Sequence, residues 1–201
     1  RRGRGSPGVL REQAELLAAD GSRVLMLARW DGADSAEPGP GSLRPVALVR
    51  LEQRLRADAP STLAYFANQG VTVKVLSGDS AVAVGAVAAA SGVIGSDRPV
   101  DAQLFAGGAD WLASSATDEL ADAVEHTNVF GRISPQQKRS VLRALRAHGH
   151  TVAMTGDGVN DVLALKNADV AVAMGSGSGA ARAVAQIVLL DDAFATLPQV
   201  V

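Results

Sequence analysis

The sequence predicts an α/β protein with a doubly wound, mostly parallel, Rossmann-like sheet. Short apolar segments alternate with helical segments rich in small residues, as is typical of parallel strands joined by covering helices. Of the 201 residues, 47% are hydrophobic but only 3% are aromatic. Ala, Val and Leu must therefore form the core, which suits close-packed parallel strands under helices. The sequence contains no cysteine, which excludes disulfides, thiolate catalysis and zinc–thiolate sites.

Charge and hydropathy limit the classes of partner. Lys and Arg (19) nearly balance Asp and Glu (21), and the formal net charge is −2. The sequence thus offers no electrostatic basis for binding nucleic acid, and we expect none. No apolar run reaches the about 18 residues of a membrane-spanning helix, so we expect the chain as given to be soluble. Its length suits one domain, or one domain with a remnant of another.

A loop rich in Pro and Gly divides the predicted elements. Before this loop, the sequence predicts a helix over Pro7–Ala19 and a strand over Ser22–Trp30. Residues 31–41 contain two prolines and three glycines, a composition that regular elements do not tolerate. We therefore expect a first domain over residues 1–44 and a second over residues 45–201.

The second predicted domain repeats a strand, a turn and a helix. Gly70 and Gly92 end two of its helices, and Ser134 with Pro135 begins another, since serine is a favourable N-cap and proline suits the first helical position. The predicted strands are Pro45–Leu51, Val71–Leu76, Gln103–Ala106, Thr127–Phe130, Thr151–Met154, Val170–Met174 and Ile187–Leu190, and the predicted helices are Ala59–Gln69, Ala81–Ala90, the segment between Ser134 and Gly149, and Ala180–Ala185.

The stretch Thr155-Gly156-Asp157-Gly158-Val159-Asn160-Asp161 lies where a predicted strand meets a helix. Ligands of open α/β sheets bind beyond the carboxyl ends of the strands. Two carboxylates beside helix N–H groups suit Mg²⁺ and a phosphate, so we predict a metal site at Asp157 and Asp161. The alternative is an ordinary strand–turn–helix corner with solvated acids.

Ser77 and Lys138 are predicted at the same edge of the sheet. Ser77 follows a predicted strand and precedes Gly78, a position from which a hydroxyl and backbone N–H groups can donate to a phosphoryl oxygen. Lys138 shares the apolar face of its helix with Val141 and Leu142. It either extends to solvent or neutralises a transferring phosphate. We favour the second, because the acidic turn and Ser77 are expected near the same edge. Together, a hydroxyl, a lysine and an acidic pair resemble a phosphoryl-transfer site of the haloacid dehalogenase type.

Several ordered motifs resemble those of the P-type cation-transporting ATPases, within the haloacid dehalogenase-like superfamily. The matching segments are Val73–Asp79 (the phosphate-holding strand, with serine where threonine is usual), Phe130–Lys138 (the lysine segment), and Thr155–Lys166 with Ala168–Val170 and Ala173–Gly175 (the hinge motif). Glu52–Asp58 departs from the usual Asp-Pro-Pro-Arg but contains Arg56. The resemblance covers about Val46 to the end and identifies the carboxyl-terminal part of the phosphorylation domain.

The resemblance implies roles for particular residues. Asp157 and Asp161 would bind Mg²⁺; Ser77, Gly78, Asp79, Lys138 and Asn160 would act at the phosphoryl group; and Arg56, Arg132, Thr155 and Gly156 would bind the nucleotide cofactor, ATP. The segment before Asp31 would be a remnant of the nucleotide-binding domain. The implied partners are the nucleotide-binding, actuator and membrane domains of a pump and its transported cation. The parent protein would lie in the cell membrane, with this part on the cytoplasmic side.

The nucleophile of the family is not found in the sequence. That aspartate belongs to an Asp-Lys-Thr-Gly-Thr run, which these 201 residues do not contain. The resemblance therefore implies a sheet that is incomplete at its N-terminal side and a chain that is inactive alone. Two alternatives are a free-standing Mg²⁺-dependent phosphatase with another nucleophile and a non-catalytic module that binds Mg²⁺ and phosphate.

Overall fold

The computed structural model describes residues 7–19, 21–30, 42–52, 54–104 and 117–199. The chain divides into two compact units, Arg1–Arg54 and Leu55–Val201. The sequence placed the boundary between residues 44 and 45. The difference arises because the strand expected to open the second domain pairs within the first unit. The predicted loop over residues 31–41 lies outside the described residues.

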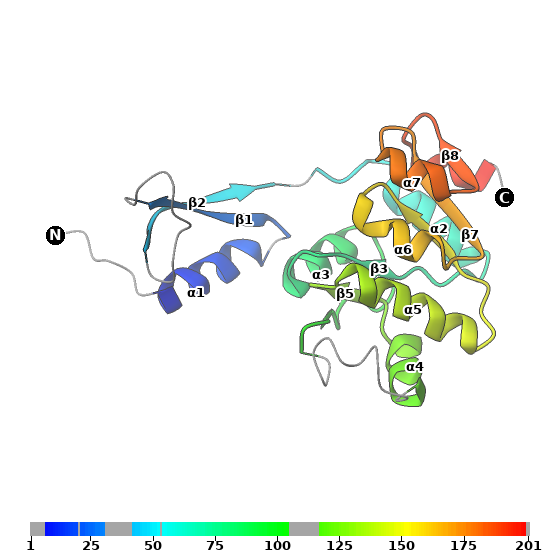
Figure 1. Cartoon of the computed structure of the whole chain (residues 1–201), viewed down its shortest axis with the longest axis horizontal. Coiled ribbons are helices and arrows are strands. Elements are labelled where there is room, and N and C mark those ends of the chain that lie inside the picture. The colour runs from blue at the N-terminus through cyan, green and yellow to red at the C-terminus, as the bar shows by residue number, and fades with distance from the viewer. Residues whose placement is uncertain (1–6, 20, 31–41, 53, 105–116, 200–201) are drawn as a thin grey trace. The chain divides into compact units, whose positions relative to one another are not determined.

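The first unit consists of a helix and an antiparallel strand pair (Figure 1). Helix α1 spans Pro7–Ala18, β1 spans Arg23–Trp30 and β2 spans Leu43–Leu51. The register shifts between Leu27 and Ala28, and Pro45 lies opposite Ala28. A proline cannot donate to a strand ladder, so it is tolerated at such an irregularity. The helix and both strands agree with the sequence prediction.

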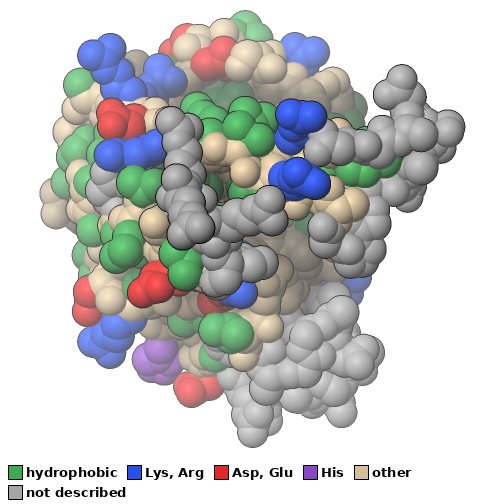
Figure 2. Space-filling view, turned by 90° about the vertical axis from the view of Figure 1, so that its left-hand side faces the viewer, with side chains coloured by type: hydrophobic (Ala, Val, Ile, Leu, Met, Phe, Trp, Pro, Cys, Tyr) green, Lys and Arg blue, Asp and Glu red, His purple; other side chains and the backbone are tan. Residues whose placement is uncertain are grey.

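The strand pair of the first unit exposes large apolar side chains. Leu25, Met26, Leu27 and Val46 are each about half exposed or more. Figure 2 shows one face of the molecule, on which hydrophobic side chains lie among basic (Lys, Arg) and acidic (Asp, Glu) side chains. A two-stranded sheet buries little apolar surface by itself, so this unit has a small core. Among the described residues, no helix is both long and apolar enough to cross a membrane.

The second unit contains two parallel sheets with intervening helices. Its elements are α2 (Ala59–Asn68), β3 (Val75–Leu76), α3 (Ala81–Ala90), β4 (Val100–Asp101), α4 (Thr117–His126), β5 (Val129–Gly131), α5 (Pro135–Ala147), β6 (Ala153–Gly156), the 3₁₀ turn η2 (Val159–Asp161), α6 (Val162–Leu165), β7 (Val170–Met174), α7 (Gly179–Val184), β8 (Ile187–Leu189) and η3 (Phe194–Gln199). One sheet has the order β3-β5-β4 and the other β6-β7-β8, and all pairs are parallel. The predicted α/β class with parallel strands is confirmed. Within the described residues, however, the strands form two ladders instead of one.

The predicted strand over Gln103–Ala106 is wrong. The strand in this region is β4, Val100–Asp101, and residues 102–104 form a turn. The Asp101 carboxylate accepts the N–H of Gln103 at 3.0 Å, and an aspartate that bonds to the backbone two residues on forms a turn in place of a continuing strand. Residues 105–106 lie outside the described part. Helix α4, at Thr117–His126, is a further element, which the sequence analysis did not predict.

Small side chains dominate the core of the second unit, as the composition predicts. Ala164, Ala171, Ala173 and Ala181 are fully buried and pack with Leu142 and Leu165 between α5, α6 and the β6–β7 ladder. In a second cluster, Val124 of α4 and Val141 of α5 pack with Phe130 of β5. Leu76 packs against both clusters, so β3 contacts the cores of both ladders.

Candidate functional site

A cavity of about 760 Å³ in the second unit is lined by the edges of β3 and β6. Most of its wall is apolar. Its polar residues come from the carboxyl ends of these strands, from the turn after β6, from α5, and from Thr72 and Lys74 just before β3. Seven residues that the sequence analysis selected line it: Ser77, Gly78, Lys138, Thr155, Gly156, Asp157 and Asp161. The two strand ends and the lysine-bearing helix, far apart in the sequence, thus meet at one cavity.

The turn after β6 brings Asp161 close to the end of the strand. The Asp161 N–H donates to the Gly158 carbonyl at 3.1 Å, and the Gly158 N–H donates to Asp161 Oδ2 at 3.3 Å. A Cβ on Gly156 would lie 2.6 Å from Asp161 Cβ, so this packing requires glycine. Asp161 is buried, at 8% exposure. Gly156 therefore allows Asp161 to pack closely against the end of β6.

Helix α5 holds Lys138 in a fixed position. Ser134 caps the helix through a reciprocal capping box with Gln137, and Lys138 lies in the first turn behind it. Lys138 Nζ donates to Asp161 Oδ1 at 2.8 Å, and each side chain is only 12% exposed. The predicted alternative, a lysine that extends to solvent, is not observed. A buried cation and a buried anion thus share the polar end of the cavity.

The loop after β3 is held by the turn after β5. The N–H groups of Arg132 and Ile133 donate to the carbonyls of Asp79 (2.7 Å) and Ser77 (3.1 Å). Ser77 Oγ accepts the Asp79 N–H at 3.2 Å. Arg132 adopts φ of 51°, a left-handed conformation that is uncommon for a residue other than glycine. The Ser77 hydroxyl is therefore positioned by a neighbouring strand as well as by its own.

Asp157 is the exposed carboxylate of the site. In the described part of the chain its side chain makes no hydrogen bond or ion pair. Its carbonyl accepts the Ser178 N–H at 2.7 Å, and Gly177 approaches its backbone so closely that a Cβ would lie 3.0 Å from the carbonyl oxygen. The loop after β7 thus supports Asp157. The sequence predicted a strand before this loop and a helix after it, but not the contact of the loop with the site.

The donor set is compatible with magnesium. The described residues contain no group of three or more His, Asp or Glu side chains arranged to hold a metal. Mg²⁺ needs fewer protein ligands than this, because it keeps several waters and commonly binds one or two carboxylates together with a phosphate. Asp157 has its carboxylate open for such a role, while Asp161 is already engaged by Lys138.

Four other selected residues do not line the cavity. Asp79 and Asn160 flank it in the two loops, and Asn160 is exposed. Arg132 Nε lies 3.4 Å from Asp101 Oδ2, a partner that sequence reasoning missed. Arg56 donates to the Asp192 carbonyl at 2.7 Å, so it ties the start of the second unit to its carboxyl-terminal segment. Their assignment to nucleotide or phosphate stays a prediction.

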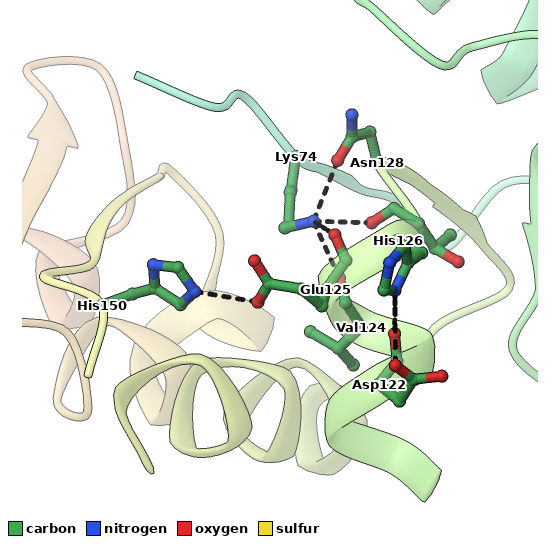
Figure 3. A network of polar contacts seen from close by, with 8 residues as sticks. Lys74, Asp122, Val124, Glu125, His126, Asn128 and His150 are labelled. Carbon is green, nitrogen blue, oxygen red and sulfur yellow. Dashed lines mark hydrogen bonds and ion pairs between the residues drawn. The ribbon is translucent and has the colours of Figure 1, made fainter. Parts of the chain in front are cut away.

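Lys74 joins the start of β3 to the end of α4 (Figure 3). Its Nζ lies within hydrogen-bond distance of the carbonyls of Val124 (2.7 Å), Glu125 (3.1 Å) and Thr127 (3.0 Å) and of Asn128 Oδ1 (2.9 Å). The last carbonyls of a helix have no partner within it, and a cation there is also favoured by the helix dipole. Burial lowers the pKa of the Lys74 ammonium, against the opposing effect of the Glu125 carboxylate.

Lys74→Met is expected to lower the free energy of unfolding by about 1–3 kcal/mol, because it leaves carbonyls at the end of α4 without a donor. Denaturant unfolding of the 201-residue chain measures this. The matched control is Lys166→Met, which removes an exposed lysine and is expected to change stability by less than about 0.5 kcal/mol. Equal effects of the two variants would contradict a capping role for Lys74.

Glu125 is expected to make a small, pH-dependent contribution. Its Oε2 lies 2.8 Å from His150 Nε2 (Figure 3). The pKa of Glu125 is lowered, mainly by this hydrogen bond. A carboxyl group whose pKa is lower in the folded state stabilises the protein above its unfolded pKa and loses this effect as the pH falls through the folded value. Glu125 is 39% exposed, so Glu125→Gln should cost less than about 1 kcal/mol at neutral pH. The difference from the native chain should vanish well below pH of about 4.3, as urea unfolding at several pH values would show.

A family model described as haloacid dehalogenase-like hydrolase matches residues 2–169 of this chain. The chain belongs to the haloacid dehalogenase-like hydrolases. Within this family, the calcium-transporting ATPase CtpE of Mycobacterium tuberculosis is 54% identical over 204 residues, which cover 98% of this chain and 24% of the relative. Calcium-transporting ATPase 1 of Saccharomyces cerevisiae is 33% identical over 193 residues, with 94% and 20% covered. The predicted relationship to the P-type cation-transporting ATPases is confirmed.

Solved structures show the same fold as this haloacid dehalogenase-like chain. A zinc-transporting PIB-type ATPase in an E2.Pi state matches 98% of this chain and 25% of its own length, with a TM-score of 0.60 and 23% identity. The catalytic domain of the CPx-ATPase CopB-B matches with a TM-score of 0.54 and 21% identity, over 87% of this chain and 56% of that domain. The chain spans about a quarter of the length of the curated relatives it matches, 24% for CtpE.

Proposed function

We propose that this chain is the phosphorylation-domain portion of an ATP-driven P-type cation pump. In this proposal Asp157 and Asp161 hold Mg²⁺, which neutralises phosphoryl charge when it is bound, and Lys138 and Ser77 contact the phosphoryl oxygens. Arg132 is proposed to contact the nucleotide. The M. tuberculosis relative is named a calcium-transporting ATPase, so Ca²⁺ is the transported cation we propose for the whole protein. We place that protein in the cell membrane, with this part on the cytoplasmic side and the nucleotide-binding, actuator and membrane domains as its partners.

One observation carries the proposal. Ser77, Lys138, Asp157 and Asp161 come from three separate segments and line the polar end of one cavity. Phosphoryl transfer depends mainly on positioning and on neutralising charge, and these residues provide a hydroxyl, a cation and two carboxylates. The Lys138–Asp161 pair, at 2.8 Å, keeps the cation at this end before any ligand binds. Lys138 would then share its N–H donors between Asp161 and a phosphoryl oxygen.

We infer that the 201 residues do not turn over ATP alone. They contain no Asp-Lys-Thr-Gly-Thr run. Of the two acids that line the cavity, Asp157 is proposed to bind Mg²⁺ and Asp161 pairs with Lys138, so we assign neither of them as the nucleophile. The aspartate that receives the phosphoryl group would come from another part of the pump. A phosphoenzyme formed by this chain alone would contradict this inference.

The test is calorimetric titration of the full chain with inorganic phosphate, which needs no nucleophilic aspartate to bind, with and without Mg²⁺. We expect binding that requires Mg²⁺ and falls by about tenfold or more in Asp157→Asn, since each charge-assisted contact to a phosphoryl oxygen or metal is worth at least about 1.4 kcal/mol. The matched control is Asp97→Asn, which removes an exposed carboxylate outside the cavity. Binding without Mg²⁺, or equal binding by both variants, would contradict the proposal. Steady phosphate release from small phosphate esters would instead support a free-standing phosphatase.

A further inference from the structure

The loop after β7, residues 175–178, lies directly against the backbone of Asp157. The Ser178 N–H donates to the Asp157 carbonyl at 2.7 Å. A Cβ on Gly177 would lie 3.0 Å from that carbonyl oxygen and 3.2 Å from Asp157 Cα. Because the loop contacts both the carbonyl and Cα, its position sets the point from which the Asp157 side chain extends.

Residues that follow the loop in the sequence hold its first half. The Gly175 N–H donates to the Leu189 carbonyl at 2.8 Å, and Arg182 Nη1 donates to the Gly175 carbonyl at 2.7 Å. The next residue, Ser176, is exposed, and its N–H donates to Asp192 Oδ1 at 2.8 Å. The carboxylate of Asp192, 16 residues away in the sequence, thus holds the loop that supports the candidate metal ligand.

The backbone of Asp192 is itself held in an uncommon conformation. Its φ is 55°, in the left-handed region that few residues other than glycine adopt, although aspartate and asparagine do so more often than most. Its N–H donates to the Leu189 carbonyl at 3.2 Å, and its carbonyl accepts Arg56 Nη1 at 2.7 Å. A backbone held in a sparsely populated region by its surroundings is a feature that clusters at functional sites.

The neighbouring aspartate, Asp191, makes a different set of contacts. Its Oδ1 accepts the Ala193 N–H at 3.1 Å, and its Oδ2 accepts the Thr196 hydroxyl at 2.6 Å. These bonds close the turn within its own segment. Two adjacent acids therefore differ in what they hold: Asp191 its own turn, and Asp192 the loop against Asp157. This difference provides a matched control for the experiments below.

We propose that Asp192 is a positioning residue for Asp157 and acts through residues 175–178. By accepting the Ser176 N–H, it keeps the loop against the Asp157 backbone, and this fixes the carboxylate that lines the cavity. Groups that orient a metal ligand without touching the metal commonly decide how tightly the metal binds. The proposal rests on the proposed function in one respect, that Asp157 is the Mg²⁺ ligand.

Backbone N–H exchange of the full chain, measured by NMR, tests the link between the two aspartates. Asp192→Gly removes the carboxylate and tolerates the left-handed backbone. We expect N–H exchange to rise by about tenfold at Ser176, which loses its acceptor, and by about threefold or more at Ser178, which is bonded to Asp157. Asp192→Asn keeps an acceptor oxygen and should restore native exchange at both. Asp191→Gly adds the same backbone freedom one residue earlier and should leave both unchanged.

Calorimetric titration with inorganic phosphate at a series of Mg²⁺ concentrations tests the consequence for the metal. In Asp192→Gly, the Mg²⁺ concentration for half-maximal phosphate binding should rise by about three- to tenfold, less than the 10–100-fold typical of a group in direct contact with a metal ligand. At saturating Mg²⁺, the fraction of chains that bind phosphate should equal that of the native chain. A variant that was only partly folded would instead bind in a smaller fraction of chains, with the Mg²⁺ dependence unchanged.

Three results would overturn the positioning role: unchanged exchange at Ser178 in Asp192→Gly, equal effects of Asp192→Gly and Asp191→Gly, or no restoration by Asp192→Asn. An unchanged Mg²⁺ dependence in Asp192→Gly would also overturn it, while phosphate binding by the native chain would leave the proposed function intact. A native chain that binds no phosphate with Mg²⁺ would contradict the proposed function instead. In that case, exchange at Ser178 still decides whether Asp192 holds the loop against Asp157.

Discussion

Lys138→Met is expected to lower the free energy of unfolding by about 3–5 kcal/mol, because it leaves the carboxylate of Asp161 buried without its cation. The two side chains are each 12% exposed and 2.8 Å apart. Among the described residues, the Asp161 carboxylate then keeps one hydrogen bond, from the N–H of Gly158 to Oδ2 at 3.3 Å. The measurement is denaturant unfolding of the full chain. The same variant should lose Mg²⁺-dependent binding of inorganic phosphate if Lys138 contacts the phosphoryl group.

A double variant distinguishes the loss of the ion pair from loss of packing. Lys138→Met with Asp161→Asn removes both charges, and it should recover most of the stability lost in Lys138→Met, since a neutral pair carries no large desolvation cost. It should not recover ligand binding, because the cation and one carboxylate remain absent. If the double variant is as unstable as the sum of the two single variants, the ion pair is not the source of the effect.

Gly131→Ala is expected to destabilise the chain by about 3 kcal/mol or more. A Cβ at Gly131 would overlap the backbone N and Cα of Ala81 and would lie 2.8 Å from the carbonyl carbon of Ser80. These atoms begin α3 and cannot move like the end of a flexible side chain. To accept the methyl group, α3 must shift away from β5, and the loop that holds Ser77 must shift with it. Stability and Mg²⁺-dependent ligand binding should therefore fall together.

The matched control is Gly179→Ala. A Cβ at Gly179 meets no atom within 4 Å, and the residue begins α7, so alanine there should be neutral or stabilise the chain by up to about 1 kcal/mol. Thermal unfolding of both variants measures the difference. A Gly131→Ala variant as stable as Gly179→Ala would show that the close approach of α3 to β5 is not needed.

Strong local signals predicted much of the fold. Val170–Met174 is a strand with the predicted bounds, and Ala81–Ala90 is a helix with the predicted bounds, because a continuous apolar run and a run of small residues behind a serine cap have few alternatives. The same holds for Ser134 and Pro135 at the start of α5. Prediction failed where a side chain decides the backbone locally. Asp101 ends β4 by accepting the Gln103 N–H, a bond that no periodicity reveals.

For the candidate site, the sequence by itself determined the kinds of groups and the turns that carry them. The motif from Thr155 to Asp161 and the position of Lys138 on the apolar face of α5 predicted acids and a cation at one edge of a sheet. Only the tertiary structure decided which groups meet. It paired Lys138 with Asp161, set Arg132 against Asp101, and opened the cavity between β3 and β6. The physical reason is that caps and turns depend on residues a few positions apart, whereas ion pairs and strand edges depend on segments brought together by packing.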